Sequence, residues 1–206
     1  MQLTKELSAI YAERADAIRR RLEEFSQVPR EKYFYEYCYC IMTPQSKAEN
    51  ALAVQKHLEK IDFRNHPCDL SEYLRGRIRF HNVKAVRLTK AAENWEKIEE
   101  VLAEGAESGF EEKLRDRLYE LSDGLGMKEC SHFLRNIGFR GLGILDRHVL
   151  RCLVQCGVFA EVPSVASKSK YLQVEAKYRE FAEFVEISPD ELDLLFWSSF
   201  AGEILK

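Results

Sequence analysis

The chain has 206 residues, of which 46% are hydrophobic and 32% charged, with only 10 Gly and 5 Pro. This composition excludes disordered, collagen-like and low-complexity chains and predicts a globular fold with its own core. Its 31 basic and 34 acidic side chains give a net charge of −3, so the overall charge gives no reason to expect a polyanionic partner.

The hydrophobic residues recur at spacings of three and four along almost the whole chain, whereas sustained alternation is hard to find. We therefore predict a nearly all-α fold. The expected helices span residues 4–25, 31–42, a segment starting at Pro44, 68–74, 83–102, 110–121, 128–137, 147–156, 168–185 and 189–200. Thr43 and Pro44 have the pattern of a cap and first-turn proline, and Ser188-Pro-Asp-Glu191 has that of a capping box.

No apolar run approaches the roughly 20 residues that cross a bilayer, and the charged N-terminus lacks the hydrophobic stretch of a signal peptide. We expect a soluble, cytoplasmic protein with no membrane partner.

Six cysteines occur in the chain, at spacings that match no zinc, redox or iron–sulfur motif. We expect them to be small buried side chains rather than metal ligands. They are Cys38, Cys40, Cys68, Cys130, Cys152 and Cys156.

A stretch from Arg75 to Lys90 contains six basic residues and no acidic one. They are Arg75, Arg77, Arg79, Lys84, Arg87 and Lys90. Such a run can form a local basic face that contacts nucleic acid, although on charge alone a solvated side of a helix is the more common explanation.

Two glycines one residue apart, Gly124 and Gly126, lie between two predicted helices and permit a tight hairpin with free amides. Amides at a helix N-terminus attract phosphate, although a plain interhelical turn would also use these glycines. Lys128 follows at the start of the next helix, and Asp146 opens a later one.

This combination resembles the helix-hairpin-helix DNA glycosylase superfamily, in which Gly-x-Gly-x-Lys is followed by Asp-x-His-x-x-Arg. The matching residues are Gly124, Gly126, Lys128, Asp146, His148 and Arg151. The lead-in departs from many members because Ser122-Asp123 stands where a Pro is frequent.

Two further segments, Cys40–Ala48 and Arg79–Ala85, are similar to segments of the same superfamily. Together with the short chain and its ending in Lys206, they resemble the second class of 8-oxoguanine DNA glycosylase/AP lyases, known from archaea and bacteria.

The resemblance implies that Lys128 attacks the anomeric carbon of the sugar, forms a Schiff base and promotes β-elimination. Asp146 would be the electrostatic and proton-transfer partner. Free lysine has a pKa of about 10.4, and a helix N-terminus helps an amine nucleophile because it disfavours the ammonium form. This chemistry needs no metal and no cofactor.

The resemblance also implies a set of DNA contacts. These are expected from Gln45, Ser46, Lys47, Lys84, Gly124, Gly126 and His148. Gln45, at a predicted helix opening, would fill the gap left by the extruded base, or else cap that helix or lie exposed. His148 would bind phosphate or be an ordinary histidine of a helix start.

The target nucleotide must leave the duplex and enter a pocket, often between aromatic faces. Phe80 and Trp197 are the candidate faces, and each has the alternative of an aromatic in the core. Lys206 would help to read the oxidised guanine, with a disordered tail as its alternative.

The sequence thus predicts a helix-hairpin-helix glycosylase fold with two helical lobes and a cleft between them. The lobes would be residues 31–137 and residues 1–30 plus 138–206. We expect a monomeric, bifunctional glycosylase/AP lyase acting on double-stranded DNA that contains oxidised guanine, associated with the nucleoid of a prokaryote.

Three alternatives stay open at this point. They are a related glycosylase for another damaged base, a non-catalytic helix-hairpin-helix DNA-binding module, and a helical interaction protein. The related enzymes commonly carry iron–sulfur cysteines that this chain lacks, and a binding module would need neither Lys128 nor Asp146.

Overall fold

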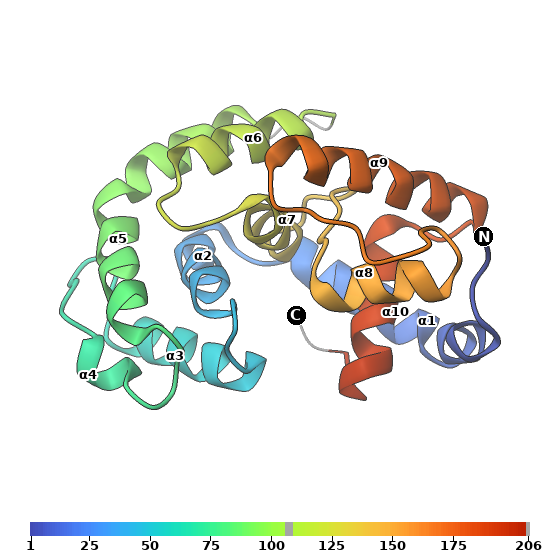
Figure 1. Cartoon of the computed structure of the whole chain (residues 1–206). Helices are drawn as coiled ribbons and strands as arrows, with labels where there is room; N and C mark the ends of the chain where they lie inside the picture. The colour runs from blue at the N-terminus through green and yellow to red at the C-terminus, as the bar shows by residue number, and fades with distance from the viewer. Residues whose placement is uncertain (106–108, 205–206) are drawn as a thin grey trace. The chain divides into compact units, whose positions relative to one another are not determined.

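The computed structural model describes residues 1–105 and 109–204, and within these ranges all regular elements are helices, which confirms the all-α prediction (Figure 1). They are α1 (Lys5–Ser26), the short 3-10 helix η1 (Arg30–Lys32), α2 (Tyr33–Met42), α3 (Ala48–Lys60), α4 (Ser71–Leu74), α5 (His81–Glu104), α6 (Glu111–Leu121), α7 (Met127–Asn136), α8 (Arg147–Gln155), α9 (Lys168–Phe184) and α10 (Pro189–Ala201). Every helix in the described ranges is too short or too polar to cross a membrane.

The start of the third helix was predicted wrongly. Helix α3 begins at Ala48 and not at Pro44, and a turn closed by the Ser46 N–H on the Thr43 carbonyl (3.0 Å) precedes it. Gln45, inside this turn, has a φ of 55°. A left-handed residue cannot belong to a right-handed helix, so Gln45 lies ahead of the helix and not in its first turn.

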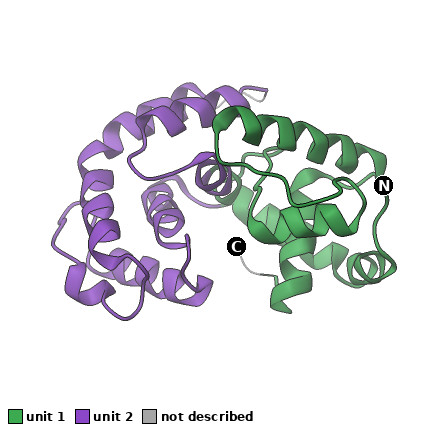
Figure 2. Cartoon of the chain, viewed as in Figure 1, with its two compact units in different colours: residues 1–27, 134–206 green, residues 28–133 purple. Residues whose placement is uncertain are grey.

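The chain divides into two compact units (Figure 2). The first combines Met1–Gln27 with the residues from Leu134 onward, and the second is Val28–Phe133.

In the first unit, α10 packs against α1, α8 and α9. The predicted capping box is present, since Ser188 Oγ accepts the Glu191 N–H (3.2 Å) and the Glu191 carboxylate accepts the Ser188 N–H (3.3 Å). Glu191 also accepts hydrogen bonds from Tyr11 and Arg19. The cap of α10 therefore also ties this helix to α1.

A buried ion pair lies in the same unit, where Arg135 Nη1 is 2.7 Å from Asp193 Oδ2. The two side chains are only 3% and 8% exposed, and the guanidinium also lies over the ring of Phe25. Removing one partner would leave an uncompensated charge in the core.

In the second unit, α2 packs against α3 and α5, and α5 in turn packs against α6 (Figure 1). Every residue from Phe34 to Met42 is buried. Phe34 and Tyr37 make edge-to-face contacts with Trp95 of α5, at centroid distances of 5.2 and 5.8 Å. Apolar side chains on all sides explain why this segment lacks the polar face of an ordinary surface helix.

Five of the six cysteines are buried as expected, but Cys68 is exposed. It lies in the irregular segment between α3 and α4, within the exposed stretch 65–69.

Candidate active site

The hairpin that joins α6 to α7 is fixed by α5. Gly124 has a φ of 95°, and a Cβ there would lie 2.1 Å from Nε of Arg87. The positive φ favours glycine at this position, and the side chain of Arg87 packs directly on it. Lys90, one turn further along α5, forms an ion pair with Asp123 of the hairpin.

Lys128 is the second residue of α7, and its side chain is 25% exposed. Its Nζ lies 2.8 Å from Oε1 of Glu129, while Oε2 of Glu129 accepts the N–H of Gly126 (3.2 Å). A Cβ on Gly126 would lie only 2.9 Å from that oxygen. The Glu129 carboxylate thus contacts both the backbone at the start of α7 and the lysine.

Glu129 was missed at the sequence level. Its signal is the spacing Gly126-x-x-Glu129, the reaching-back half of a capping box at the start of α7.

Asp146 is the N-cap of α8. Its Oδ1 accepts the N–H groups of His148 (2.7 Å) and Val149 (2.8 Å), so one carboxylate oxygen is committed to the cap. A cap of this kind holds the side chain in a fixed orientation.

The segment before Asp146 is held by α9. The Tyr171 hydroxyl donates to the Gly143 carbonyl (2.6 Å) and accepts the Leu145 N–H (3.3 Å). Glu175 accepts the Gly143 N–H (2.7 Å). Hydrogen bonds from α9 therefore fix the backbone that leads to Asp146, as the cap fixes its side chain.

His148 lies against the exposed ring of Phe200, with 4.0 Å between the ring centroids and 34° between the ring planes. Burial lowers the pKa of His148, and the nearby charge of Asp146 opposes that shift. Burial and the carboxylate thus act on the charge of this imidazole in opposite directions.

The turn ahead of α3 presents Gln45 and Lys47 as exposed side chains. Ser46 Oγ accepts the backbone N–H of Arg79 and the ammonium of Lys84, each at 3.2 Å. Ser46 is therefore engaged within the protein.

Lys84 was expected to contact DNA from a basic face, but the structure places its side chain inside the protein. The residue is 2% exposed and donates to the carbonyls of Met42 (2.8 Å) and Pro44 (2.7 Å). Burial lowers the pKa of Lys84 to about 8, helped by the positive charges of Arg87 and Lys128.

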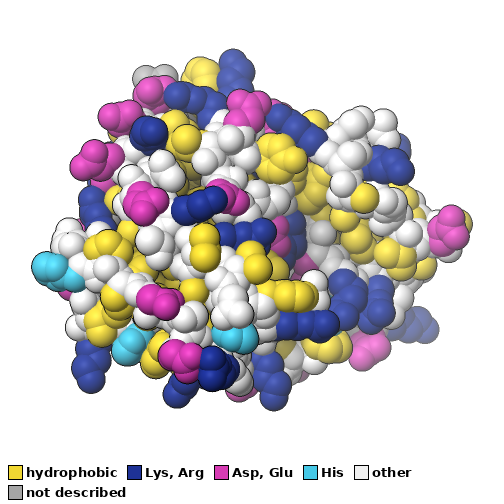
Figure 3. Space-filling model, turned by 60° about the vertical axis from the view of Figure 1, so that its left-hand side comes forward, with side chains coloured by type: hydrophobic (Ala, Val, Ile, Leu, Met, Phe, Trp, Pro, Cys, Tyr) yellow, Lys and Arg dark blue, Asp and Glu magenta, His cyan; other side chains and the backbone are white. Residues whose placement is uncertain are grey.

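Three other residues of the basic run are also in contact with other groups of the protein. Arg75 pairs with Glu72, Lys90 pairs with the hairpin, and Arg87 packs on it. On the face in Figure 3, lysines and arginines are interspersed with acidic and hydrophobic side chains.

Phe80 is not a core aromatic, because its side chain is 53% exposed. It has a φ of 60°, directly precedes α5, and lies under the guanidinium of Arg79 at 5.2 Å from the ring centre. Trp197, in the other unit, is partly buried on α10, and Lys206 lies outside the described residues.

Comparison with known proteins decides the family. The family model for 8-oxoguanine DNA glycosylase matches residues 18–187. The chain belongs to this family. The 8-oxoguanine DNA glycosylase/AP lyase of Fusobacterium nucleatum is 36% identical over 98% of this chain and 96% of its own length. The enzyme of the same description from Methanocaldococcus jannaschii is 33% identical over the full length of both chains.

Solved structures of this glycosylase family agree. The M. jannaschii 8-oxoguanine glycosylase/lyase bound to DNA containing 8-oxoguanine superimposes with a TM-score of 0.84, at 31% identity and 98% coverage of both chains. The 8-oxoguanine DNA glycosylase of Thermotoga maritima gives a TM-score of 0.85 at 32% identity, covering 98% of this chain and 97% of its own. The resemblance inferred from the hairpin and Asp146 is thereby confirmed.

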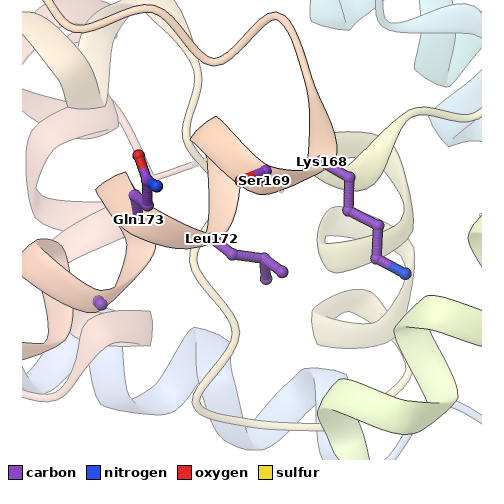
Figure 4. Close-up of a pocket in the computed structure, with 5 residues that line it drawn as sticks. Lys168, Ser169, Leu172 and Gln173 are labelled. Carbon is purple, nitrogen blue, oxygen red and sulfur yellow. The ribbon is translucent and has the colours of Figure 1, made fainter.

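Two other features of this glycosylase add no residue to the candidate active site. In the ranges the structure describes, no group of three His, Cys, Asp or Glu residues could hold a metal ion. A surface pocket on α9, lined by Lys168, Ser169, Leu172, Gln173 and Ala176, contains none of the predicted site residues (Figure 4).

Proposed function

We propose that this protein is a bifunctional DNA repair enzyme that excises 8-oxoguanine from double-stranded DNA and then cleaves the strand as an AP lyase. The observation that carries the proposal is the amine of Lys128 at a glycine-built helix start, with a carboxylate in contact, in a chain related over its full length to enzymes of that description.

In the first step, Nζ of Lys128 attacks C1′ of the damaged nucleotide. The bond between C1′ and N9 breaks, its electron pair leaves with the base, and the base takes up a proton. The ammonium must lose a proton before it can attack. Oε1 of Glu129, at 2.8 Å, is within range to accept it.

Asp146 supplies negative charge where positive charge develops on the sugar. Its Oδ1 is held by two amides, and this hold keeps the carboxylate in one orientation while Oδ2 remains outside those bonds. An orientation that needs no rearrangement during the reaction is what electrostatic catalysis requires.

The lyase step follows from the amine nucleophile. The opened sugar and Lys128 form a Schiff base, a proton leaves C2′, and the C3′–O bond breaks, so the 3′ phosphate departs with its electron pair. Hydrolysis of the Schiff base returns Lys128 to its amine form.

The remaining predicted residues have proposed roles in DNA binding. Gln45 fills the gap in the duplex, and the hairpin amides of Gly124 and Gly126 hold phosphate. Phe80 and Trp197 stack on nucleobases, and Lys206 reads the oxidised guanine. The enzyme acts as a monomer in the cytoplasm, associated with the nucleoid.

Sodium borohydride tests the proposal, because it reduces a Schiff base to a stable link between enzyme and DNA. We expect trapping on a duplex with 8-oxoguanine, and preference for that lesion over a panel of duplexes that each contain another damaged base. Trapping only with a different lesion would indicate the related glycosylase. DNA binding without any trapping would indicate the non-catalytic module.

A further inference from the structure

Two exposed residues of the second unit hold a backbone conformation that ordinary side chains rarely adopt. Gln45 has a φ of 55° and Phe80 a φ of 60°. Non-glycine residues stay in the left-handed region only where their surroundings impose it, and such positions concentrate at functional sites. Something in this unit must hold both.

A single hydroxyl joins the two segments. Ser46, next to Gln45, accepts the backbone N–H of Arg79, which immediately precedes Phe80. The same Oγ accepts a hydrogen bond from Lys84. The turn before α3 and the start of α5 are thus bonded to each other at the two left-handed residues.

Lys84 completes this connection. Its backbone N–H closes the first turn of α5 on the Phe80 carbonyl (3.0 Å), and its side chain reaches the carbonyls of Met42 and Pro44. The ammonium therefore bonds to residues on both sides of Gln45, and it belongs to the helix that Phe80 directly precedes.

The three acceptors of this ammonium are two carbonyls and a hydroxyl, and none is a carboxylate. Burying a cation against neutral oxygens is costly, and this burial, together with the positive charges of Arg87 and Lys128, lowers the pKa of Lys84 to about 8. A methionine could fill the same space but would not donate to the carbonyls of Met42 and Pro44, so the hydrogen bonds of the ammonium, and not packing alone, explain a lysine here.

We propose that Lys84 is a positioning residue for base extrusion. Its ammonium and the Ser46 hydroxyl hold Gln45 and Phe80 as one preformed pair that meets the DNA as the damaged nucleotide leaves the stack. Segments whose backbone is ordered in advance lose less conformational entropy on binding, which leaves more of the binding energy for opening the duplex. This inference rests on the proposed function.

The experiment compares two reactions of one active site. Excision of 8-oxoguanine from a duplex requires extrusion of a stacked base, whereas strand cleavage at a preformed abasic site in the same duplex does not. For Lys84→Met under single-turnover conditions, we expect excision to slow about tenfold or more while abasic-site cleavage stays within about threefold of the wild type. A 2-aminopurine placed beside the lesion should report slower unstacking.

Ser46 provides a milder pair of variants for the case in which Lys84→Met does not fold. Ser46→Ala removes the shared hydroxyl and should shift the ratio of the two rates in the same direction, whereas Ser46→Thr keeps a hydroxyl and should restore it. Leu58→Ala, a fully buried site of α3, is the matched control that lowers stability without touching the pair. Its ratio should equal that of the wild type.

Equal slowing of both reactions in Lys84→Met and in Ser46→Ala would show that these residues only support the fold and would overturn the inference. Unchanged excision in both variants would do the same. A wild-type protein that cleaves abasic sites but leaves 8-oxoguanine in place would instead overturn the proposed function, and this inference with it.

Discussion

The two proposed catalytic side chains lie at the N-termini of two helices, and these side chains have opposite charges. Helix α8 begins with Asp146 as its N-cap, while α7 has Lys128 in its first turn. The free amides of a helix N-terminus attract an anion and repel a cation. Asp146 is therefore held by its own helix, whereas Lys128 is held by a neighbouring carboxylate, that of Glu129.

The two sites therefore differ in whether the residue that reacts is also the residue that fixes its position. At α8, the cap and the catalytic charge belong to one carboxylate. At α7, the amine and its holder are different residues, and Glu129 also binds the Gly126 N–H. A substitution at α7 can therefore remove the reactive amine and leave the carboxylate that positions it, or the reverse.

The largest effect is expected for Lys128→Gln. This change removes the nucleophile but leaves the hairpin amides in place, so excision and borohydride trapping should both fall to background while affinity for lesion DNA survives. Gel-shift and trapping assays on one duplex measure the two properties side by side. Normal trapping by this variant would refute the assignment of the nucleophile.

The next effect is expected for Asp146→Asn, which keeps an oxygen for the cap and removes the charge. Turnover should fall about 100-fold or more, with an unchanged temperature of unfolding. Single-turnover excision and thermal unfolding measure these quantities. A loss of less than about tenfold, roughly 1.4 kcal/mol, would mean that Asp146 serves only as the cap of α8.

Much of this arrangement could be predicted from the sequence. The helices follow from persistent apolar spacing, and the identities around Gly124, Lys128 and Asp146 are specific enough to indicate the family. These features are local, since each depends on neighbours within a few residues along the chain.

The features that were predicted wrongly or missed depend on contacts between distant segments. Thr43 and Pro44 have a local helix-start pattern. The structure has a turn there instead, with Gln45 in the left-handed region and hydrogen bonds from Lys84 to the backbone just before it. Lysine is ordinarily exposed, so nothing local indicates that Lys84 is buried. Glu129 could have been found from its spacing to Gly126, although its contact with the lysine could not.

A smaller effect is expected at Glu129, where two variants separate its two contacts. Glu129→Gln can still accept the Gly126 N–H but cannot take a proton from Lys128, so excision should slow about tenfold with little change in stability. Glu129→Ala should slow excision similarly and also lower the free energy of unfolding by about 1 kcal/mol, because the start of α7 loses a cap. Equal excision rates in the wild type and Glu129→Gln would show that the carboxylate only caps the helix.

The smallest effect concerns His148, which lies beside Asp146 at the start of α8. Burial lowers its pKa in the folded protein below the unfolded value of about 6.5. Between those two values the unfolded chain binds more protons, so stability falls as the pH drops through 6.5, by at most about 1.4 kcal/mol per pH unit for one proton. His148→Phe keeps a ring against Phe200 and should lose this acid-sensitive contribution.

Because the charge of Asp146 raises the pKa of His148, Asp146→Asn should make the acid-induced loss larger than in the wild type. Urea unfolding between pH 7.5 and 5.5 measures all three proteins, and an identical pH dependence in each would show that the anion at this helix start does not stabilise the neighbouring imidazolium.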